Sequence, residues 1–535
     1  MNKIKAVALN LHDHNTYDGV WHNQRERHTR FKHNLPYYAE AYAHQSDKLN
    51  PNDYKLNDEF IKEYFKKPND SVLAFSYTSG GIRKSKEELL QTILKDHNKI
   101  FDYVPTKLFD NYYKDKIYYI DHHQSHATYA FINSGFKESD ILAIDGIGSR
   151  YRCVFFDKDQ TLIDMSDKLP IGWLWNHMSN LTGFGTLCAG KLMGLSAYGK
   201  FSDYFYNIFE IIFDGKITEK KQKHFKHINL EKHRIEDLAY TLQQFTMDKI
   251  KDNVYPLKSS ENLCVAGGVS YNGYMNEAFT KRWKNVHVPP AVGDEGQALG
   301  AYQHADYVLN GNKHVVDTYS GKAYDWEPTE DERINDQNMY ERWSSGKGFQ
   351  WGYEALFWEP LNMTEVAQQI ADGKTVGWFQ GKSESGNRAL GNRSILADPR
   401  NPDIKEIINS SIKMREDFRP FAPAVMEEHY KEYFATNQPS PYMSRIMPVI
   451  SDKIPGVTHV DGTARIQTVN REQNEKYYDI INEFYKITGV PMLLNTSFNC
   501  QEPIVETPED AIATFYKCGL DVLVIDNYVQ RKIND

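Results

Sequence analysis

Three arginines and two glycines lie within one fifteen-residue stretch, 386–400, which has the sequence GNRALGNRSILADPR. Arginine presents a planar fork that fits phosphate and carboxylate groups bidentately. Glycine has no Cβ atom, so its backbone can approach a ligand closely. Arginines in loops are usually solvated, but further basic clusters at 413–420 and 463–465 weaken that interpretation. The pattern predicts a pocket for a phosphorylated or carboxylated small molecule.

A second group has the residue types that bind metal ions. His122 and His126 lie four residues apart, so both project from one face of a predicted helix. Asp145 ends a predicted strand in a glycine turn, and Asp294 lies just before another predicted helix. Two imidazoles and two carboxylates suit a divalent transition metal such as iron(II), manganese or zinc. The two histidines alone would more often be core or capping residues; the two aspartates favour the metal.

Two further positions suit nucleotide binding and proton transfer. Gly267 and Gly268 follow a predicted strand at 263–266, where backbone N–H groups can meet a phosphate or ribose. A glycine pair alone is more often a tight turn. His12 follows the first predicted strand and is a candidate general base, a weak signal because the chain has 19 histidines.

The elements that carry these residues predict an α/β fold. An apolar strand at 4–9 is followed by a polar turn at 10–19. A second strand, 141–144, runs through an acidic glycine turn into a returning strand at 151–156, which is typical of a hairpin. Two such openings more than a hundred residues apart indicate a duplicated architecture with a cleft between its halves.

The C-terminal part follows a polar, turn-rich stretch at 315–360 that we expect to connect two domains. Helical periodicity resumes at 363–371, and a buried strand at 375–379 precedes the arginine-rich stretch. The expected domains are 1–350, which includes the start of the connection, and 361–535.

Composition bounds the function. The chain has 535 residues, 40% apolar and 25% charged, as in an ordinary soluble protein of at least two domains. Its net charge of −9 argues against binding of long nucleic acid but leaves room for a nucleotide in a local basic pocket. Five scattered cysteines without CxxC spacing suit reduced thiols. No signal core and no apolar run long enough to span a membrane is present, so we expect a cytoplasmic enzyme with no membrane partner.

Together these strings resemble the O-carbamoyltransferases of antibiotic biosynthesis and nodulation-factor modification, over nearly the whole chain. The resemblance implies an N-terminal domain similar to the actin-like ATPase fold (ASKHA-type) of tRNA threonylcarbamoyl transferases and a YrdC-like adenylate-forming C-terminal domain. The strings that carry it are His12-Asp13, 122–127, Asp145-Gly146, 190–199, Gly267-Gly268 with Asn272, 293–296, 388–400, 418–423, 463–465 and 494–499.

Two places depart from the family's pattern. The family usually has Arg-Met-Glu and then Gly-Pro before Arg-Ala-Leu-Gly, whereas this chain has Lys382-Ser383-Glu384 and Gly386-Asn387. The positive charge is kept at Lys382, but the rigidity of the loop is not assured. The first turn lacks the small residues usual after His-Asp, which indicates a differently shaped acceptor site.

The resemblance implies two steps. In the C-terminal domain, carbamoyl phosphate and ATP give carbamoyl adenylate and pyrophosphate. In the N-terminal domain, an acceptor hydroxyl takes the carbamoyl group and AMP leaves. The positions that match the family's anion-binding residues are Arg388, Lys413, Arg419 and Arg465. Ser497, beside Asn495 and Thr496, would donate a hydrogen bond to a phosphate or carbamoyl oxygen.

The implied roles in the N-terminal domain use the remaining residues. The metal, with iron(II) favoured, would bind the adenylate's phosphate and polarise the carbamoyl group, held by His122, His126, Asp145 and Asp294. The nucleotide would be seated by Gly267, Gly268 and Asn272, with Lys191 as a further phosphate contact. His12 would remove the acceptor proton, and magnesium would accompany ATP.

Other functions and acceptors stay open at this point. A tRNA threonylcarbamoyl-type enzyme and a non-catalytic nucleotide-binding regulator are the alternatives to carbamoyl transfer. The acceptor is expected to be a hydroxyl-bearing small molecule such as a sugar or antibiotic, or a hydroxymethylated pyrimidine nucleotide. The aromatic content of 13% suits stacking on a base, stacking on a sugar or plain core packing equally well. A homodimer is also an open option.

Overall fold

The computed structural model describes residues 3–9, 14–24, 26–27, 71–77, 99–101, 104–105, 117–146, 148, 151–185, 187–213, 228–329 and 357–532. The chain forms two compact units. The N-terminal unit comprises 1–320 with the short segments 385–387 and 444–446, and the C-terminal unit comprises 321–384, 388–443 and 447–535.

Two sheets of similar topology form the core of the N-terminal unit, in the orders β3-β2-β1-β4-β6-β5 and β11-β10-β7-β8-β9. Each contains three antiparallel neighbours (β3-β2-β1 and β9-β8-β7) that continue into parallel strands (β4-β6 and β10-β11). The strands are β1 (Lys3–Leu9), β2 (His14–Tyr17), β3 (His22–Gln24), β4 (Ser71–Tyr77), β5 (Val104–Pro105), β6 (Ile117–Ile120), β7 (Asp140–Ile144), β8 (Cys153–Phe156), β9 (Leu162–Asp164), β10 (Asn262–Ala266) and β11 (Asn285–His287). The predicted duplicated α/β architecture is confirmed. The expected polar turn at 10–19 is corrected, because it contains β2.

Two buried helices, α6 (His122–Ser134) and α13 (Gln297–Asn310), pack against each other and against the sheets. Tyr129 of α6 joins the core of the first sheet, whereas Phe131 joins that of the second. The helices cross closely at Gly300, where a Cβ atom would lie 2.0 Å from the carbonyl oxygen of Ser125. Only a glycine permits this approach, which brings the start of α6 beside the start of α13.

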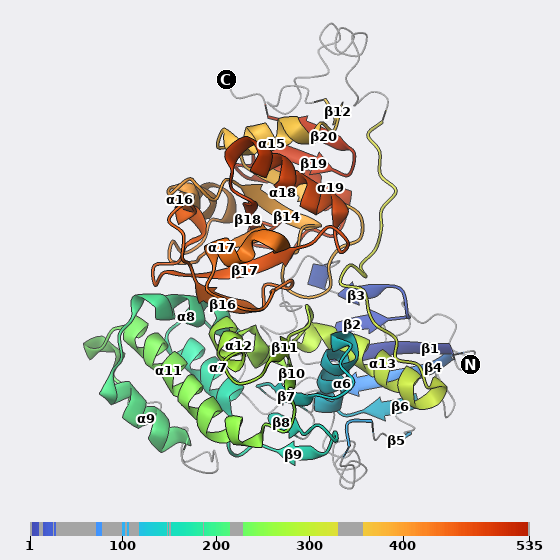
Figure 1. Ribbon diagram of the computed structural model, residues 1–535, viewed down its shortest axis with the longest axis vertical. Coiled ribbons are helices and arrows are strands. Elements are labelled where there is room, and N and C mark those ends of the chain that lie inside the picture. The colour runs from blue at the N-terminus through green and yellow to red at the C-terminus, as the bar shows by residue number, and fades with distance from the viewer. Residues whose placement is uncertain are drawn as a thin grey trace, which may run out of the picture. The chain divides into compact units, whose positions relative to one another are not determined.

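Five further helices of the described residues fall between β9 and β11 in the sequence, and α11 packs against α8 and α9 (Figure 1). They are α7 (Ile171–Leu181), α8 (Ala189–Leu195), α9 (Asp203–Phe213), α11 (Ile235–Asn253) and α12 (Gly273–Phe279), with the 3₁₀ turns η5 (Ser196–Tyr198), η6 (Leu230–Lys232), η7 (Tyr255–Leu257) and η8 (Gly268–Tyr271). A further 3₁₀ turn, η9 (Asp294–Gly296), follows β11.

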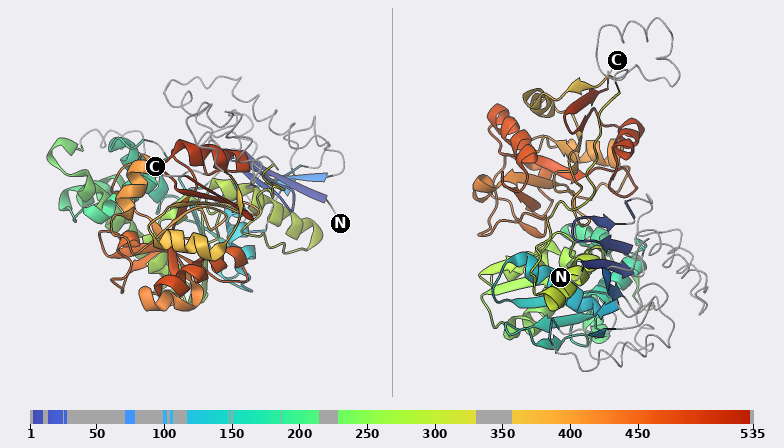
Figure 2. Two further views of the ribbon diagram at one scale, coloured as in Figure 1. Left: turned by 90° about the horizontal axis from the view of Figure 1, so that it is seen from above. Right: turned by 90° about the vertical axis from the view of Figure 1, so that its right-hand side faces the viewer.

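A mixed sheet of nine described strands forms the C-terminal unit, in the order β12-β20-β19-β13-β14-β18-β15-β17-β16. Helices α15 and α18 cover one face and α19 the other (Figure 2). The strands are β12 (Glu359–Pro360), β13 (Val376–Phe379), β14 (Arg393–Ala397), β15 (Ala422–Met426), β16 (Arg445–Pro448), β17 (Thr463–Val469), β18 (Met492–Ser497), β19 (Val522–Ile525) and β20 (Tyr528–Arg531). The helical elements are α15 (Met363–Ala371), α16 (Ile404–Ile407), the π-helical turn η12 (Ile408–Lys413), η13 (Glu427–His429), α17 (Tyr430–Tyr433), η14 (Pro455–Val457), α18 (Glu475–Thr488) and α19 (Pro508–Lys517). The predicted helix at 363–371 and strand at 375–379 are confirmed.

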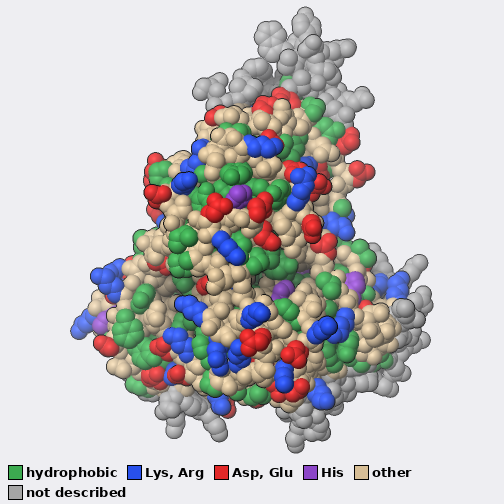
Figure 3. Space-filling view, in the orientation of Figure 1, with side chains coloured by type: hydrophobic (Ala, Val, Ile, Leu, Met, Phe, Trp, Pro, Cys, Tyr) green, Lys and Arg blue, Asp and Glu red, His purple; other side chains and the backbone are tan. Residues whose placement is uncertain are grey.

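Acidic and basic side chains are interspersed on the face of each unit that Figure 3 shows. Within the described ranges, no helix is both long and apolar enough to cross a bilayer. His12 and 330–356 of the expected connection lie outside the described residues. The described part of that connection up to residue 329 contains no helix or strand beyond α13.

Asp121 should stabilise the first turn of α6, because its carboxylate accepts the N–H groups of His123 (2.8 Å) and Gln124 (3.3 Å). That turn carries His122, one of the predicted metal ligands. Asp121→Ala should cost about 1 kcal/mol of unfolding free energy and lower metal affinity, since the first turn frays. Asn362→Ala, which removes the N-cap of α15, is the matched control with a similar cost. Urea denaturation and metal titration measure the two effects. Equal metal affinity in the two variants would contradict the assignment.

Candidate functional site

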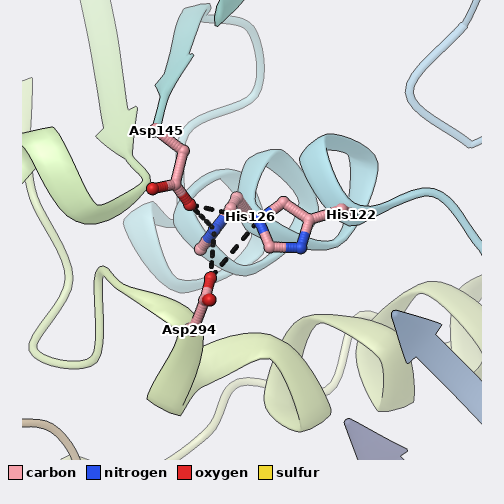
Figure 4. A group of neighbouring side chains, drawn as sticks. All are labelled: His122, His126, Asp145 and Asp294. Atoms are coloured by element: carbon pink, nitrogen blue, oxygen red, sulfur yellow. Dashed lines mark hydrogen bonds and ion pairs between the residues drawn. The ribbon is translucent and has the colours of Figure 1, made fainter. Parts of the chain in front are cut away.

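His122, His126, Asp145 and Asp294 converge within the N-terminal unit (Figure 4). The Nε2 atom of His122 lies 3.1 Å from Asp145 Oδ2 and 3.3 Å from Asp294 Oδ1. The Nε2 atom of His126 lies 3.2 Å and 3.6 Å from the same two oxygens. Both histidines are buried, so the four groups predicted from the sequence share one enclosed site.

Three elements bring these side chains together. The histidines lie on the first and second turns of α6, Asp145 directly follows β7, and Asp294 opens the 3₁₀ turn before α13. The amide of buried Asn15 donates to the carbonyl of Asp294 (2.8 Å) and accepts the N–H of Ala298 (2.8 Å). Asn15 therefore holds the Asp294 turn, a role that sequence patterns did not indicate because the contact is between distant segments.

The electrostatics of the cluster are those of paired buried charges. Burial alone would lower the pKa of His126, but hydrogen bonds and charges from Asp145 and Asp294 raise it to about 9. Burial alone would raise the pKa of Asp145, but His122 and His126 hold it well below its usual range. The shifts of His126 and Asp145 thus favour the charged form of each of these two groups.

The donor set fits a divalent transition metal. One ligand atom from each of the four residues lies within 4.8 Å of the other three. The 3.1–3.6 Å separations match the ligand–ligand spacing around an ion with bonds of ~2.1 Å. Nitrogen and oxygen donors together suit iron, manganese or zinc.

The glycine pair lies against this cluster. Gly267 has φ +91°, and a Cβ atom there would lie 2.2 Å from the carbonyl oxygen of Ile144. A Cβ atom on Gly268 would lie 3.0 Å from Asp145 Oδ1. The backbone of the Gly267-Gly268 turn, which is predicted to bind a nucleotide, therefore lies close to Asp145, one of the four predicted metal ligands.

Two other predicted nucleotide contacts have different settings. The side chain of Asn272 caps α12 by accepting the N–H of Met275 (3.1 Å) and donates to Gln243 (2.8 Å). These contacts give it a structural role, and its contact with a nucleotide stays a prediction. Lys191 is half-buried on α8.

In the C-terminal unit, the loop that carries Arg388 lies over the face of the sheet that also carries Arg465 and Ser497. The amide of Asn495 donates to the carbonyl of Ala389 (3.1 Å), and that of Gln467 donates to the carbonyl of Leu390 (2.9 Å). Side chains alternate along a strand, so Ser497 and Arg465 lie on the same face as these two amides. The loop that carries Arg388 is thereby fixed over this face, whereas Thr496 projects to the other face.

Lys413 reaches the same region from the end of the π-helical turn. Its ammonium group is almost completely buried and donates to the Oδ1 (2.6 Å) and carbonyl (2.9 Å) oxygens of Asn499 and to the carbonyl of Ser497. π-helical turns are frequent at functional sites. Lys413 both orders the turn after β18 and adds a positive charge beside Ser497.

Arg415 is a further candidate for anion binding that the sequence analysis did not name, although it lies in the basic cluster at 413–420. Burial and the charge of Arg419 lower its pKa to about 9. It donates to Asn409 (2.7 Å) and stacks over Phe421 at 4.7 Å. Arg419 is itself paired with Glu416 at 3.7 Å, and the charge of Glu416 opposes the lowering of the Arg415 pKa.

Two of the three arginines in the opening stretch are structural. Arg393 is fully buried and donates to the carbonyls of Gln380 (2.7 Å) and Gly381 (3.0 Å). Arg400 pairs with Asp398 at 2.6 Å. Arg388 is therefore the one member of that stretch that remains a ligand candidate.

Two family models match separate parts of the chain. A model described as "Carbamoyltransferase N-terminus" matches residues 22–302, and one described as "Carbamoyltransferase C-terminus" matches residues 367–532. The chain belongs to the carbamoyltransferase family and is a carbamoyltransferase.

Its similarity to named relatives is substantial. The chain is 34% identical over 449 residues to nodulation protein NolO of Bradyrhizobium diazoefficiens, covering 77% of this chain and 79% of that protein. It is 35% identical over 455 residues to nodulation protein NolNO of Sinorhizobium fredii, covering 78% and 64%. Among solved structures, the 2-hydroxyisocaproyl-CoA dehydratase activator of Clostridium difficile is similar at TM-score 0.34 and 11% identity, covering 59% and 98%, a likeness too low to support an argument.

The cluster predicts metal loss on substitution. His122→Ala and His126→Ala should each lower affinity for a divalent transition metal by at least ~10–100-fold while the unit stays folded, because each removes one donor of four. His304→Gln alters a buried histidine on α13 whose ring bonds the carbonyl of Ile100, and it should keep the metal. Elemental analysis and circular dichroism measure the outcome. Unchanged metal content in both alanine variants would exclude the site.

Proposed function

We propose that this chain is an ATP-dependent O-carbamoyltransferase. The observation that carries the proposal is the closeness of the Gly267-Gly268 turn to Asp145, since a Cβ atom on Gly268 would lie 3.0 Å from Asp145 Oδ1. A glycine turn of the kind that binds nucleotides therefore lies beside a candidate metal cluster in a carbamoyltransferase. A carbamoyl adenylate would offer a phosphate to both features at once. In the C-terminal unit, we call the face of the sheet that carries Arg465 and Ser497 the anion-type face. It supports a separate site where that adenylate forms.

The first step takes place on the C-terminal unit, for which we keep the YrdC-like assignment. Water releases phosphate from carbamoyl phosphate, and an oxygen of the resulting carbamate attacks the α-phosphorus of ATP. A phosphorus–oxygen bond forms and pyrophosphate leaves. Positioning and charge neutralisation are the main needs of such chemistry, so no protein nucleophile is required. The groups that meet these needs are Arg388, Lys413, Arg415, Arg419, Arg465 and Ser497, with Mg²⁺ bound to ATP.

The second step takes place on the N-terminal unit. The acceptor hydroxyl attacks the carbamoyl carbon, its proton passes to His12, and AMP leaves. His122, His126, Asp145 and Asp294 would hold the metal, with iron(II) favoured, and a bound metal supplies Lewis-acid polarisation of the carbamoyl group. Gly267 and Gly268 present backbone to the nucleotide.

The acceptor is a hydroxyl-bearing small molecule. A sugar or antibiotic hydroxyl is the acceptor class that the family resemblance implies, and a hydroxymethylated pyrimidine nucleotide is the alternative. A screen of hydroxyl acceptors for radiolabelled carbamate ester separates the two classes.

Pyrophosphate exchange tests the first step. The protein should exchange labelled pyrophosphate into ATP only with carbamoyl phosphate present, and Arg388→Ala, Arg419→Ala and Ser497→Ala should each lower exchange by ~10²-fold or more. Arg471→Ala removes an exposed arginine paired with Glu475 and serves as the matched control. Exchange that requires bicarbonate and threonine would favour a tRNA threonylcarbamoyl-type enzyme, and no exchange would favour a nucleotide-binding regulator.

His12 separates the two steps. His12→Ala should leave pyrophosphate exchange intact and lower formation of the carbamate ester by ~10²–10⁴-fold, because only the acceptor must lose a proton. Product analysis by mass spectrometry, together with the exchange rate, measures both. Loss of exchange in a variant that keeps its metal would contradict the two-site scheme.

A further inference from the structure

A carboxylate is buried inside the basic loop of the C-terminal unit. Glu384 is only 1% exposed. Its Oε1 atom accepts the backbone N–H groups of Leu390 (2.5 Å), Asn392 (3.4 Å) and Arg393 (3.4 Å). Three backbone donors within four residues converge on one carboxylate oxygen, much as backbone nests bind a free anion, while the N–H group of Gly391 donates to Ser394 Oγ (3.1 Å). Here the chain's own side chain takes the place of that anion.

The base of this loop is held independently. The guanidinium group of Arg393 donates to the carbonyls of Gln380 (2.7 Å) and Gly381 (3.0 Å) and stacks at 3.6 Å on Phe379. The amides of Gln380 and Asn474 both donate to Asn392 Oδ1 at 2.8 Å. The loop therefore starts and ends on a fixed base.

Between that base and the nest lies Arg388. The carbonyls of Ala389 and Leu390, the two residues after it, face Asn495 and Gln467 on the anion-type face of the sheet. The bond from Leu390 N–H to Glu384 closes the backbone around Arg388 from the other side. Gly391, with φ +111°, lies within this segment, and glycine raises the entropy lost when a loop is ordered.

We infer that Glu384 is a positioning residue for adenylate formation, which fixes Arg388 over the anion-type face by binding the backbone of its loop. The inference rests on the proposed function. Hydrogen bonds to an ionised acceptor are about twice as strong as neutral ones, so the charge of Glu384 matters beyond its shape. The Lys382-Ser383-Glu384 departure from the family's pattern thus keeps the group that orders the loop. Ser383 adds a second anchor, since its hydroxyl lies 3.0 Å from both carboxylate oxygens of Glu506.

The chain offers an isosteric test. The Oε2 atom of Glu384 is buried without a hydrogen-bond partner among the described residues. Glu384→Gln can therefore keep an oxygen in the nest and place its amide nitrogen where Oε2 was, which removes charge with little change of shape. Asp398→Asn removes the charge of another buried carboxylate in the same unit, one that pairs with Arg400 and not with the loop, and is the matched control.

Hydrogen exchange measures the loop directly. In Glu384→Gln, the amides of Leu390, Asn392 and Arg393 should exchange at least about tenfold faster than in the wild type, whereas Asp398→Asn should leave them protected. This readout does not depend on activity. Unchanged protection in Glu384→Gln would overturn the inference even if the variant lost activity.

A double-mutant cycle then tests whether Glu384 acts through Arg388. Glu384→Gln and Arg388→Lys should each lower carbamoyl-phosphate-dependent pyrophosphate exchange about tenfold or more, and the double variant should lose no more than the worse single variant. Losses that multiply in the double variant would overturn the inference, because the residues would then act independently. Absence of exchange in the wild type would instead exclude the proposed function, and the hydrogen-exchange result would still decide the role of Glu384.

Discussion

Two carboxylates facing two buried imidazoles set the main constraint on the N-terminal unit. Charges removed from water cost several kcal/mol each unless they are paired or bound to a metal. The pKa of His126 is raised to about 9 and that of Asp145 is held well below its usual range, so each charge depends on its neighbours. Close crossing of α6 and α13 at Gly300 and the Asn15 clamp on the Asp294 turn keep these neighbours together.

The C-terminal unit presents a different case, in which basic side chains lie near a buried carboxylate. Burial and the charge of Arg419 lower the pKa of Arg415, and the charge of Glu416 opposes that shift. A buried Glu384 does not neutralise these cations through salt bridges. It binds backbone N–H groups instead, and so orders the loop that carries Arg388. The two units thus hold buried charges by different means. Histidine and aspartate side chains pair with each other in the N-terminal unit, and backbone N–H groups bind the Glu384 carboxylate in the C-terminal unit.

Much of the fold was predictable because the signals are local. Helical periodicity located α15 at its observed bounds, and Asp121 before two histidines marked the start of α6. The strand–turn–strand repeats indicated the duplicated sheets. The strand β2 was missed because it lies inside a polar segment. Its backbone pairs with β1 and β3, and it has no apolar run of its own. Arg393 and Arg400 were grouped with Arg388 because sequence shows residue type but not which carbonyl or carboxylate a guanidinium meets.

By itself the sequence was sufficient to recognise the family, and that resemblance tied together the four candidate metal ligands and the candidate anion-binding residues. Only the tertiary structure decided which of them share a site. Asp294 reaches His122 across more than 170 residues, and Gln467 reaches Leu390 across 77. Contacts of that kind depend on how sheets and helices pack, and packing is set by complementarity of buried surfaces that no local pattern records. The same reason explains why Glu384, a single acidic residue among arginines, acquired a role only when its three backbone partners were seen around it.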